Sequence, residues 1–334
     1  MSAVGPPVPS VPVARAAAPV RPGFGQTTAS PIATEPVAPT SGALSESEPG
    51  LLADLVTLTK PRLNLLVLLT TLGGLYLASP DGVPAPLILH TLLGSALVAG
   101  GASALNQVIE RDTDRLMRRT RARPLAAGRR SVMVGTWFGV LLSAAGLVEL
   151  AARVNVVAAG LALGTLVSYV AVYTPMKTRS SLSTLVGAVP GALPPVIGWS
   201  AATGEVSLPA LVLFGIVFFW QMPHFLAIAW LYRDDYARAG MPLLPVVEPD
   251  GLRTGRQALI YAAVLWPVSL MPTIVGLAGA PYAAIAAGLG LMFVGLSAFF
   301  ARDRTPATAR QLFLFSILYL PLLLGALVVD RLWL

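Results

Sequence analysis

The chain contains no cysteine. Disulfide bridges and thiolate metal sites are therefore excluded. Charged residues are also scarce, at 12% of the 334 residues, whereas soluble domains carry about 25%. A shortage of this size indicates that most of the chain does not face water.

Long apolar runs take the place of the missing charge, and hydrophobic residues make up 55% of the chain. A membrane-spanning helix needs about 20 apolar residues, and backbone groups in lipid must be bonded within helices or a closed barrel. The runs are continuous rather than alternating, which excludes a barrel. We therefore predict an all-α polytopic membrane protein with nine spans, near residues 63–79, 87–109, 132–152, 154–174, 182–202, 208–231, 257–278, 282–301 and 311–329.

Residues 1–50 differ in composition from the rest. They hold ten prolines together with Ala, Ser and Thr, and they lack the apolar core of a signal peptide. A Pro-rich segment with little to bury is expected to be disordered. The sequence thus predicts a disordered tail at 1–50 and one intramembrane domain at 51–334.

The net charge of +7 reflects membrane orientation rather than nucleic-acid binding, because Lys and Arg gather in cytoplasmic loops. With a cytoplasmic N-terminus, the tail and the even-numbered loops carry all but two of the 23 Lys and Arg residues, the exceptions being Arg153 and Arg331. This predicts a multi-pass plasma-membrane protein with its polar chemistry near the cytoplasmic face. No nucleic-acid partner is expected.

Three polar residues stand four apart at the end of the second predicted span, namely Asn106, Glu110 and Asp114. At about 100° per residue they lie along one side of a helix, and we call them the polar stripe. Asp112 points elsewhere, toward water or a neighbouring arginine. Oxygen ligands at a membrane surface suit Mg²⁺, which shares its coordination with water and a substrate phosphate. The polar stripe is therefore a predicted Mg²⁺ site.

An arginine cluster follows directly, with Arg118, Arg119, Arg121 and Arg123. Arginine binds phosphate oxygens in pairs, so acids followed by arginines predict a diphosphate site. Lys177, at the cytoplasmic end of the fourth span, could bind phosphate as a point charge. The alternatives are that the acids form ion pairs with the adjacent arginines at a solvated helix end, and that Lys177 is an ordinary membrane anchor.

A second acidic group, Asp234 and Asp235, follows the sixth span. Two acidic groups on the same side of the membrane could face each other across a central cavity. His224 lies about two turns inside this helix end, and it is a candidate to ligate or orient a heme iron or to act as a base. The alternative is a hydrogen-bonded packing histidine. His90 lies near the opposite face and is not expected to join the chemistry.

These motifs resemble the UbiA superfamily of intramembrane prenyltransferases. The resemblance rests on Asn106-x3-Glu110-x3-Asp114, Arg119-Thr-x2-Arg123-Pro124 and Tyr173-Thr-Pro-x-Lys177. Two further stretches are similar to the heme-farnesylating branch, Trp220-Gln-Met-Pro-His224-Phe and Asp235-Tyr-x2-Ala-Gly-x-Pro242-x-Leu-Pro245. Glu110 stands where many members have Asp. Ala239 stands where the second family motif often has another Asp, which leaves Asp234 and Asp235 as an adjacent pair.

The resemblance implies nine helices around a central cavity and a Mg²⁺-dependent reaction. In that reaction a farnesyl group passes from farnesyl diphosphate to a vinyl group of heme B, and water addition gives heme O. Catalysis is then expected from the polar stripe and Asp235, and metal binding from the polar stripe with Asp234 and Asp235. The implied diphosphate ligands are Arg119, Arg123, Lys177 and Tyr173, and the implied heme-binding residues are Trp220 and His224. A functional link to heme-copper oxidase assembly is also implied.

Three other functions stay open from the sequence. The first is a prenyltransferase that acts on an aromatic quinone precursor, the second a transporter, and the third a non-catalytic assembly factor for a heme-copper oxidase. Transporters tend to place ionisable groups near the membrane midplane. Here the acids lie at the cytoplasmic helix ends, which favours an enzyme.

Overall fold

The computed structural model describes residues 49–332. The predicted tail therefore lies outside the described residues, apart from its last two positions. Within residues 49–332 every regular element is helical, and this confirms the all-α fold.

Eight helical spans in the described range are long and apolar enough to cross a membrane. A ninth results when α1 (Leu51–Leu58) and α2 (Pro61–Leu77), which meet at a 45° bend, are taken as one span. The nine predicted segments are thus confirmed. The eight are α3 (Ala85–Ile109), α5 (Val132–Arg153), α6 to α7 (Val156–Met176), α8 with α9 (Ser183–Thr203), α10 (Leu208–Leu231), α13 (Leu252–Ile274), α14 (Ala280–Asp303) and α15 (Pro306–Arg331).

Among the eight unbent spans, the seventh differs most from its predicted bounds, because the sequence predicts 257–278 and α13 begins at Leu252. Gly251 precedes it with a φ of 70°, and the Asp250 carboxylate accepts a hydrogen bond from the Leu252 amide at 3.1 Å. Gly251 is the N-cap, so this turn starts the helix before the predicted apolar run begins. Gly276, with a φ of 75°, follows the other end of the helix. Turn chemistry rather than apolar periodicity therefore sets the bounds of α13.

Two of the spans are interrupted. Between α8 (Ser183–Ala192) and α9 (Pro194–Thr203), two consecutive prolines remove the amides that would continue the helix. In the preceding span, α6 (Val156–Val167) passes into the π-helical segment η1 (Ser168–Tyr173) and then α7 (Thr174–Met176). π-Helical turns are frequent at functional sites, and this one is followed by α7 and then Lys177.

Small residues bring α2 and α9 into close backbone contact. A Cβ atom at Gly198 would lie 1.8 Å from the carbonyl oxygen of Thr71, and one at Gly74 would lie 2.0 Å from that of Pro195. This is the small-residue packing that is typical of membrane helices. The glycines of the fifth span and of α2 therefore serve helix packing.

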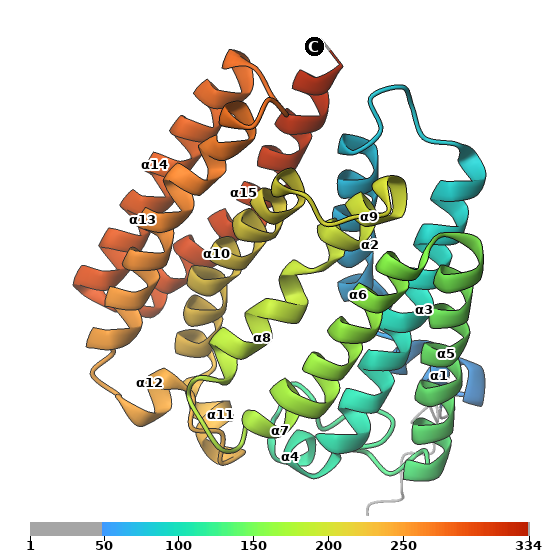
Figure 1. Ribbon diagram of the computed structural model, residues 1–334. Helices are drawn as coiled ribbons and strands as arrows, with labels where there is room; N and C mark the ends of the chain where they lie inside the picture. The colour runs from blue at the N-terminus through green and yellow to red at the C-terminus, as the bar shows by residue number, and fades with distance from the viewer. Residues whose placement is uncertain (1–48, 333–334) are drawn as a thin grey trace, which may run out of the picture. The chain divides into compact units, whose positions relative to one another are not determined.

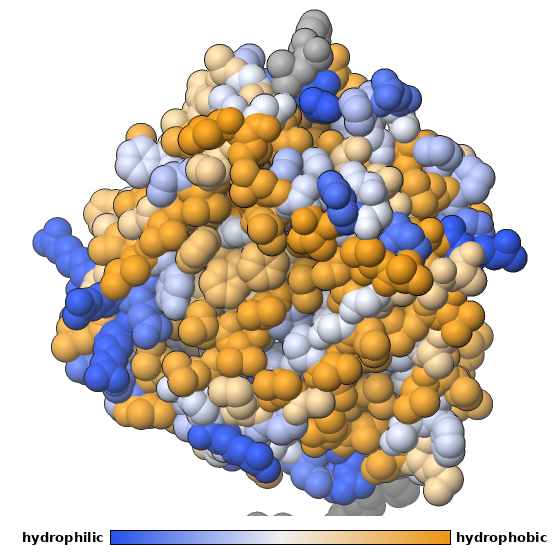
Figure 2. All heavy atoms as spheres, in the orientation of Figure 1, coloured by the Kyte–Doolittle hydropathy of each residue, from blue (hydrophilic) through white to orange (hydrophobic). Residues whose placement is uncertain are grey.

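The apolar core lies mainly among α10, α13, α14 and α15, and Phe293, Phe300 and Tyr319 are fully buried there. Many Leu, Val and Ile side chains on the spans are exposed instead, as expected for helices that face lipid. In Figure 2 hydrophobic residues cover the middle of the visible face, and most strongly hydrophilic residues lie toward its margins. The chain is therefore a multi-pass membrane protein.

The short helices gather at one end of the bundle (Figure 1), where they build the site described below. They are α4 (Arg111–Leu116), α7, α11 (Arg233–Arg238) and α12 (Leu244–Val247). Near them, the buried Asp54 of α1 pairs with Arg129 at 3.0 Å and with Arg130 at 2.8 Å. These ion pairs fix α1 to the segment that joins α4 and α5.

Two further polar contacts involve charged residues of the spans. His90 of α3 lies 2.6 Å from Glu149 of α5. At the end of α15, the carboxylate of Asp330 accepts hydrogen bonds from the amides of Gly279 and Tyr282, the latter at 3.1 Å. Asp330 thereby caps the first turn of α14.

Candidate active site

A pocket of about 690 Å³, open on one side, lies among the helix ends at the end of the bundle that carries the short helices. Side chains from the α1–α2 bend, α3, α4, η1, α8, α10 and α11 contribute to it. Its lining consists of Lys60, Asn106, Glu110, Asp114, Met117, Arg119, Thr120, Arg123, Tyr173, Lys177, Ser183, Thr184, Phe225, Ile228, Ala229, Tyr236, Met241 and Leu243.

The three residues of the polar stripe all line this pocket and are all buried. Asn106 belongs to the last turn of α3, Glu110 joins α3 to α4, and Asp114 lies in α4. The Asp114 amide donates to the carbonyl of Glu110 at 2.8 Å. The backbone therefore stays helical between α3 and α4. Their spacing of four therefore keeps the three side chains on one side, as the sequence indicated.

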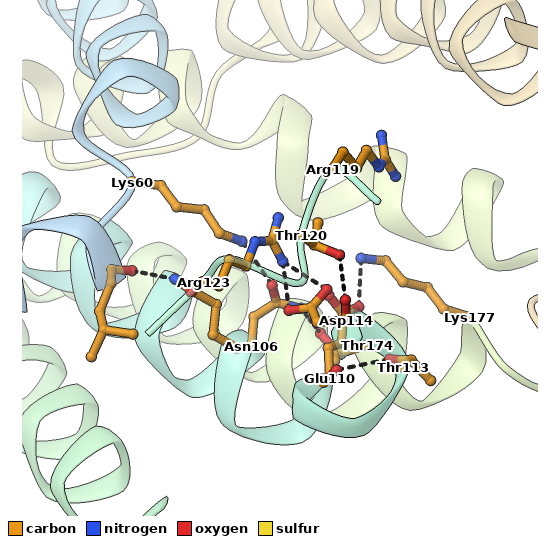
Figure 3. A network of polar contacts seen from close by, with 12 residues as sticks. Lys60, Asn106, Glu110, Thr113, Asp114, Arg119, Thr120, Arg123, Thr174 and Lys177 are labelled. Atoms are coloured by element: carbon orange, nitrogen blue, oxygen red, sulfur yellow. Dashed lines mark hydrogen bonds and ion pairs between the residues drawn. The ribbon is translucent and has the colours of Figure 1, made fainter. Parts of the chain in front are cut away.

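Each residue of the polar stripe contacts a cation (Figure 3). Lys60 donates from Nζ to Oδ1 of Asn106 at 2.9 Å, and Lys177 donates to Oε1 of Glu110 at 2.7 Å. The guanidinium of Arg123 reaches both carboxylate oxygens of Asp114, at 2.9 and 2.7 Å. The predicted pairing of the acids with neighbouring arginines thus exists for Asp114, but inside the pocket rather than at a solvated helix end.

The π-helical segment places Tyr173 and Lys177 in the same pocket. The Lys177 ammonium lies 4.5 Å from the centre of the Tyr173 ring, a cation–π distance. Gly187 makes room for that ring, because a Cβ atom there would lie 2.5 Å from Cε2 of Tyr173. Thr174 accepts a hydrogen bond from Nδ2 of Asn106 at 3.1 Å and donates to the carbonyl of Tyr169 at 2.8 Å. The side-chain oxygen and the side-chain nitrogen of Asn106 therefore each have a hydrogen-bond partner, Lys60 and Thr174.

Arg119 lies at the rim of the pocket and is held by tyrosines. It donates to the hydroxyl of Tyr236 at 2.6 Å, and its guanidinium lies 4.7 Å from the Tyr236 ring centre and 5.2 Å from that of Tyr232. No carboxylate forms an ion pair with Arg119 among the described residues. Its charge is therefore available to an anion.

Positive charge exceeds negative charge among the side chains that line the pocket. Four are cationic, Lys60, Arg119, Arg123 and Lys177, and two are carboxylates, Glu110 and Asp114. An anion with more than one negative charge would correct this imbalance. The charge of the lining thus favours a diphosphate over a neutral ligand.

The environment moves the pKa values of the two carboxyls in opposite directions. Burial raises the pKa of Glu110, but the neighbouring cations, Lys177 first among them, together outweigh burial and hold that pKa below its usual value. Burial raises the pKa of Asp114 above its usual value, although Arg123 opposes the shift. Burial lowers the pKa of Lys177, but Tyr173, Glu110 and Tyr169 together outweigh burial, so the net shift is upward. Lys177 and Glu110 are therefore both charged at neutral pH.

The polar stripe fits Mg²⁺ by its donor chemistry. Within residues 49–332 no three His, Cys, Asp or Glu side chains form a complete metal cluster. A cation at the polar stripe would take two carboxylates and the Asn106 amide oxygen, and water or substrate would fill the other positions. Mg²⁺ is usually bound in this way, whereas Zn²⁺ prefers nitrogen and sulfur ligands.

The second acidic pair does not join this pocket. The side chain of Asp234 is 86% exposed, and that of Asp235 forms an ion pair with Arg238 on the same short helix. Neither residue contributes to the lining. Asp112 also points away, being 72% exposed and 3.0 Å from Arg111.

Trp220 and His224, which the sequence assigned to heme, lie deeper on α10. Their rings stack at 5.2 Å between centres with an interplanar angle of 22°. Nδ1 of His224 lies 2.7 Å from the hydroxyl oxygen of Ser316 on α15, and Nε1 of Trp220 donates to the carbonyl of the same serine at 2.7 Å. Both side chains therefore belong to the α10–α15 contact.

Sequence reasoning gave no role to Lys60 and Tyr236, which line the pocket, or to Thr174, which accepts a hydrogen bond from Asn106. One signal for Lys60 was available, because the chain has only two lysines and Lys60 directly precedes an apolar span. Both lysines line the pocket. No comparable sequence signal distinguishes Thr174, whose role depends on the π-helical turn.

Comparison with known proteins agrees with this architecture. Residues 67–319 match the UbiA prenyltransferase family. Two relatives named protoheme IX farnesyltransferase are each 46% identical to this chain. The match with the relative from Solibacter usitatus covers 83% of this chain and 98% of the relative. The match with the relative from Myxococcus xanthus covers 86% of this chain and 98% of the relative.

Solved structures with the same fold are more distant in sequence. A digeranylgeranylglyceryl phosphate synthase has a TM-score of 0.73 at 17% identity, over 85% of this chain and 99% of that chain. A UbiA homolog from Archaeoglobus fulgidus bound to GPP and Mg²⁺ has a TM-score of 0.58 at 17% identity, over 82% and 99%. The family match and the identity with the relatives agree: the chain belongs to the UbiA prenyltransferase family.

Proposed function

We propose that this chain transfers a farnesyl group from farnesyl diphosphate to a vinyl group of heme B and so forms heme O. The observation that carries the diphosphate half is the buried polar stripe, which shares one pocket with three half-buried cations and the exposed Arg119. The names of the relatives support the acceptor, because both are protoheme IX farnesyltransferases.

The diphosphate would occupy the cationic side of the pocket. Arg119 is held by Tyr236 and has no carboxylate partner among the described residues, so it can bind phosphate oxygens without breaking an ion pair. Arg123 and Lys177 are paired with the carboxylates of Asp114 and Glu110 and can exchange these partners for phosphate. Fixed cations around a leaving group stabilise the charge that develops on it.

We propose that Mg²⁺ binds at Asn106, Glu110 and Asp114, and when bound it would neutralise charge on the departing diphosphate. The homolog from Archaeoglobus fulgidus, bound to GPP and Mg²⁺, supports this assignment. The hydrogen bond from Lys60 to Asn106 keeps the amide oxygen turned toward the pocket. A second Mg²⁺ at Asp234 and Asp235 has no such support, since neither residue lines the pocket.

The reaction then proceeds by cleavage of the allylic C–O bond, whose electron pair leaves with the diphosphate. The vinyl π electrons form the new C–C bond to the farnesyl carbon. Water adds to the resulting cation and loses a proton, which yields the hydroxyl group of heme O. Phe225, Ile228 and Leu243 form apolar walls of the pocket and would keep water away from the first cation.

The acceptor site is proposed at Trp220 and His224, with residues 51–334 as the catalytic domain. The excess of Lys and Arg in the loops at the pocket end supports, by the positive-inside rule, a cytoplasmic position for this end. This orientation is part of the proposal.

The decisive experiment is an acceptor assay. Purified protein is incubated with farnesyl diphosphate, Mg²⁺ and either heme B or an aromatic quinone precursor, and products are identified by mass. Conversion of heme B to a species with the mass of heme O supports the proposal. If only the aromatic acceptor is prenylated, the proposed heme substrate is wrong and the chain acts on a quinone precursor instead. If neither product forms, enzyme activity on these substrates is refuted.

A further inference from the structure

One residue of α15, Ser316, contacts both side chains that are proposed to bind heme. Its main-chain carbonyl accepts from Nε1 of Trp220, and its hydroxyl oxygen lies 2.7 Å from Nδ1 of His224. Ser316 is fully buried, and 92 residues separate it from His224 along the chain. It thus joins two distant helices at the proposed acceptor site.

The hydrogen bonds of Ser316 determine the tautomer of His224. A serine hydroxyl has a single proton to donate, and that of Ser316 goes to the carbonyl of Phe313 at 2.6 Å. The same oxygen must therefore accept from His224, so Nδ1 carries the hydrogen. Nε2 is then left with its lone pair, and among residues 49–332 no group forms a hydrogen bond to it.

The imidazole ring is also fixed in orientation. It stacks on Trp220, with ring centres 5.2 Å apart, and lies 5.2 Å from the ring of Phe313. Phe225 flanks it at 5.5 Å. With Nδ1 held by Ser316 and three aromatic rings against the imidazole, the ring presents Nε2 in one direction.

We propose that Ser316 is a positioning residue that prepares Nε2 of His224 to bind the iron of the acceptor heme. Metal-binding histidines usually donate the other ring N–H to a fixed acceptor, which sets the tautomer and raises the basicity of the ligand. This inference rests on the proposed function and adds the group that makes His224 a ligand rather than a packing residue.

The position of His224 suits such a role. Phe225, the next residue of α10, and Ile228, four residues along, both line the diphosphate pocket, and four residues correspond to about 6 Å along the helix axis. A heme bound at His224 would therefore lie next to the pocket. The vinyl group could then meet the allylic carbon.

The first test uses purified full-length protein and heme B, read out by the Soret band and by the iron–histidine stretching band of the ferrous complex. Ser316→Ala removes the acceptor of the Nδ1 hydrogen but keeps the carbonyl that binds Trp220. Loss of such a supporting group typically weakens metal binding 10- to 100-fold. We expect heme affinity to fall at least about tenfold, the stretching band to shift to lower frequency, and the KM for farnesyl diphosphate to stay unchanged.

Two matched variants complete the set. Ser316→Thr retains a hydroxyl and should restore heme affinity. Ser297→Ala removes another fully buried hydroxyl on α14, which has no hydrogen-bond partner among the described residues, and should leave heme binding as in the wild type. Unchanged affinity and stretching frequency in Ser316→Ala would overturn the inference.

A second measurement needs no altered Ser316. In ¹⁵N-histidine-labelled wild-type protein, the ring nitrogens of His224 are assigned by comparison with His224→Asn. We expect a protonated Nδ1 and an unprotonated Nε2, and the opposite tautomer would overturn the inference even if Ser316→Ala failed to fold. Wild-type protein that makes no heme O would refute the proposed function, whereas wild-type activity with the opposite tautomer would refute only the role of Ser316.

Discussion

The ammonium of Lys60 lies 2.9 Å from the amide oxygen of Asn106 and donates a hydrogen bond to it. Lys60 also forms the bend between α1 and α2, where its φ is 49°. This left-handed conformation is uncommon in a residue with a side chain, and backbone strain of this kind is concentrated at functional sites. The bend and the polar stripe are therefore connected through one side chain.

Replacement of this lysine should impair turnover. Hydrogen bonds to charged groups contribute about 1.5–3 kcal/mol, so Lys60→Met is expected to lower kcat/KM by roughly 10- to 100-fold. Arg62→Met, which removes an exposed cation two residues away, is the matched control and should retain activity. Equal activity of the two variants would show that the Lys60 contact has no catalytic consequence.

Asp114 should be needed for chemistry and not for membrane insertion. Asp114→Asn keeps the shape of the side chain but removes the charge that pairs with Arg123 at 2.7 Å and is proposed to hold Mg²⁺. Loss of one preorganised electrostatic group costs about 100- to 1000-fold in kcat. Heme O formation by membranes with matched protein levels measures the effect. Asp112→Asn, at an exposed carboxylate two residues away, should be close to wild type, and an active Asp114→Asn variant contradicts the metal assignment.

Metal and diphosphate should each increase the affinity of the other. In the ligand-free pocket, Glu110 is paired with Lys177 and Asp114 with Arg123. A diphosphate alone would draw the cations away and leave buried carboxylates unpaired, and Mg²⁺ alone would leave the cations unpaired. Coupling between sites typically amounts to 5- to 150-fold.

This coupling can be measured by calorimetric titration with an unreactive farnesyl thiodiphosphate. We expect its affinity to fall at least about tenfold when EDTA replaces Mg²⁺. The reverse titration, Mg²⁺ with and without the analogue, must show the same factor. Identical affinities with and without metal would argue against a shared site.

His224 should serve the acceptor and not the donor. His224→Ala is expected to raise the KM for heme and to weaken heme binding, while farnesyl thiodiphosphate binding stays intact, because the ring lies outside the diphosphate pocket. His90→Ala provides the control, since His90 is the only other histidine and its partner is Glu149. If His224→Ala leaves heme affinity and turnover unchanged, His224 is a packing residue and does not bind heme.

Asp330 should matter for stability alone. Its carboxylate caps the first turn of α14 through Gly279 and Tyr282, and loss of a helix cap costs about 0.5–2 kcal/mol. Asp330→Ala is therefore expected to lower the thermal unfolding temperature in detergent by a few degrees without a change in KM for either substrate. Asp303→Ala removes a carboxylate that is 45% exposed at the other end of α14. This control variant should leave the thermal unfolding temperature unchanged.

The sequence predicted the features that depend on local spacing. Residues Asn106, Glu110 and Asp114 share a side because four residues make about one helical turn, and Arg123 and Lys177 reach them from nearby helix ends. The nine spans follow from hydropathy alone. Their ends do not, as α13 demonstrates, because Asp250 and Gly251 start that helix before the apolar run begins.

Features that depend on three-dimensional packing could not be predicted. Lys60 reaches Asn106 from the bend between α1 and α2, where its backbone is left-handed. The hydrophobic periodicity of the sequence does not predict that backbone conformation. Ser316 contacts His224 because α15 packs on α10, and a lone serine in an apolar helix carries no pattern. The position of Asp234 and Asp235 on the same side of the membrane as the polar stripe suggested that the two groups could face each other, whereas in the structure Asp235 pairs with Arg238 on its own helix.

The chain's only two lysines are Lys60 and Lys177, and both line the pocket. Reagents that acylate amines ignore guanidinium groups, so apart from the α-amino group they would address this pocket alone. Shielding of the two ammonium groups from such a reagent would report occupancy by any ligand, without the need for turnover or for an engineered label.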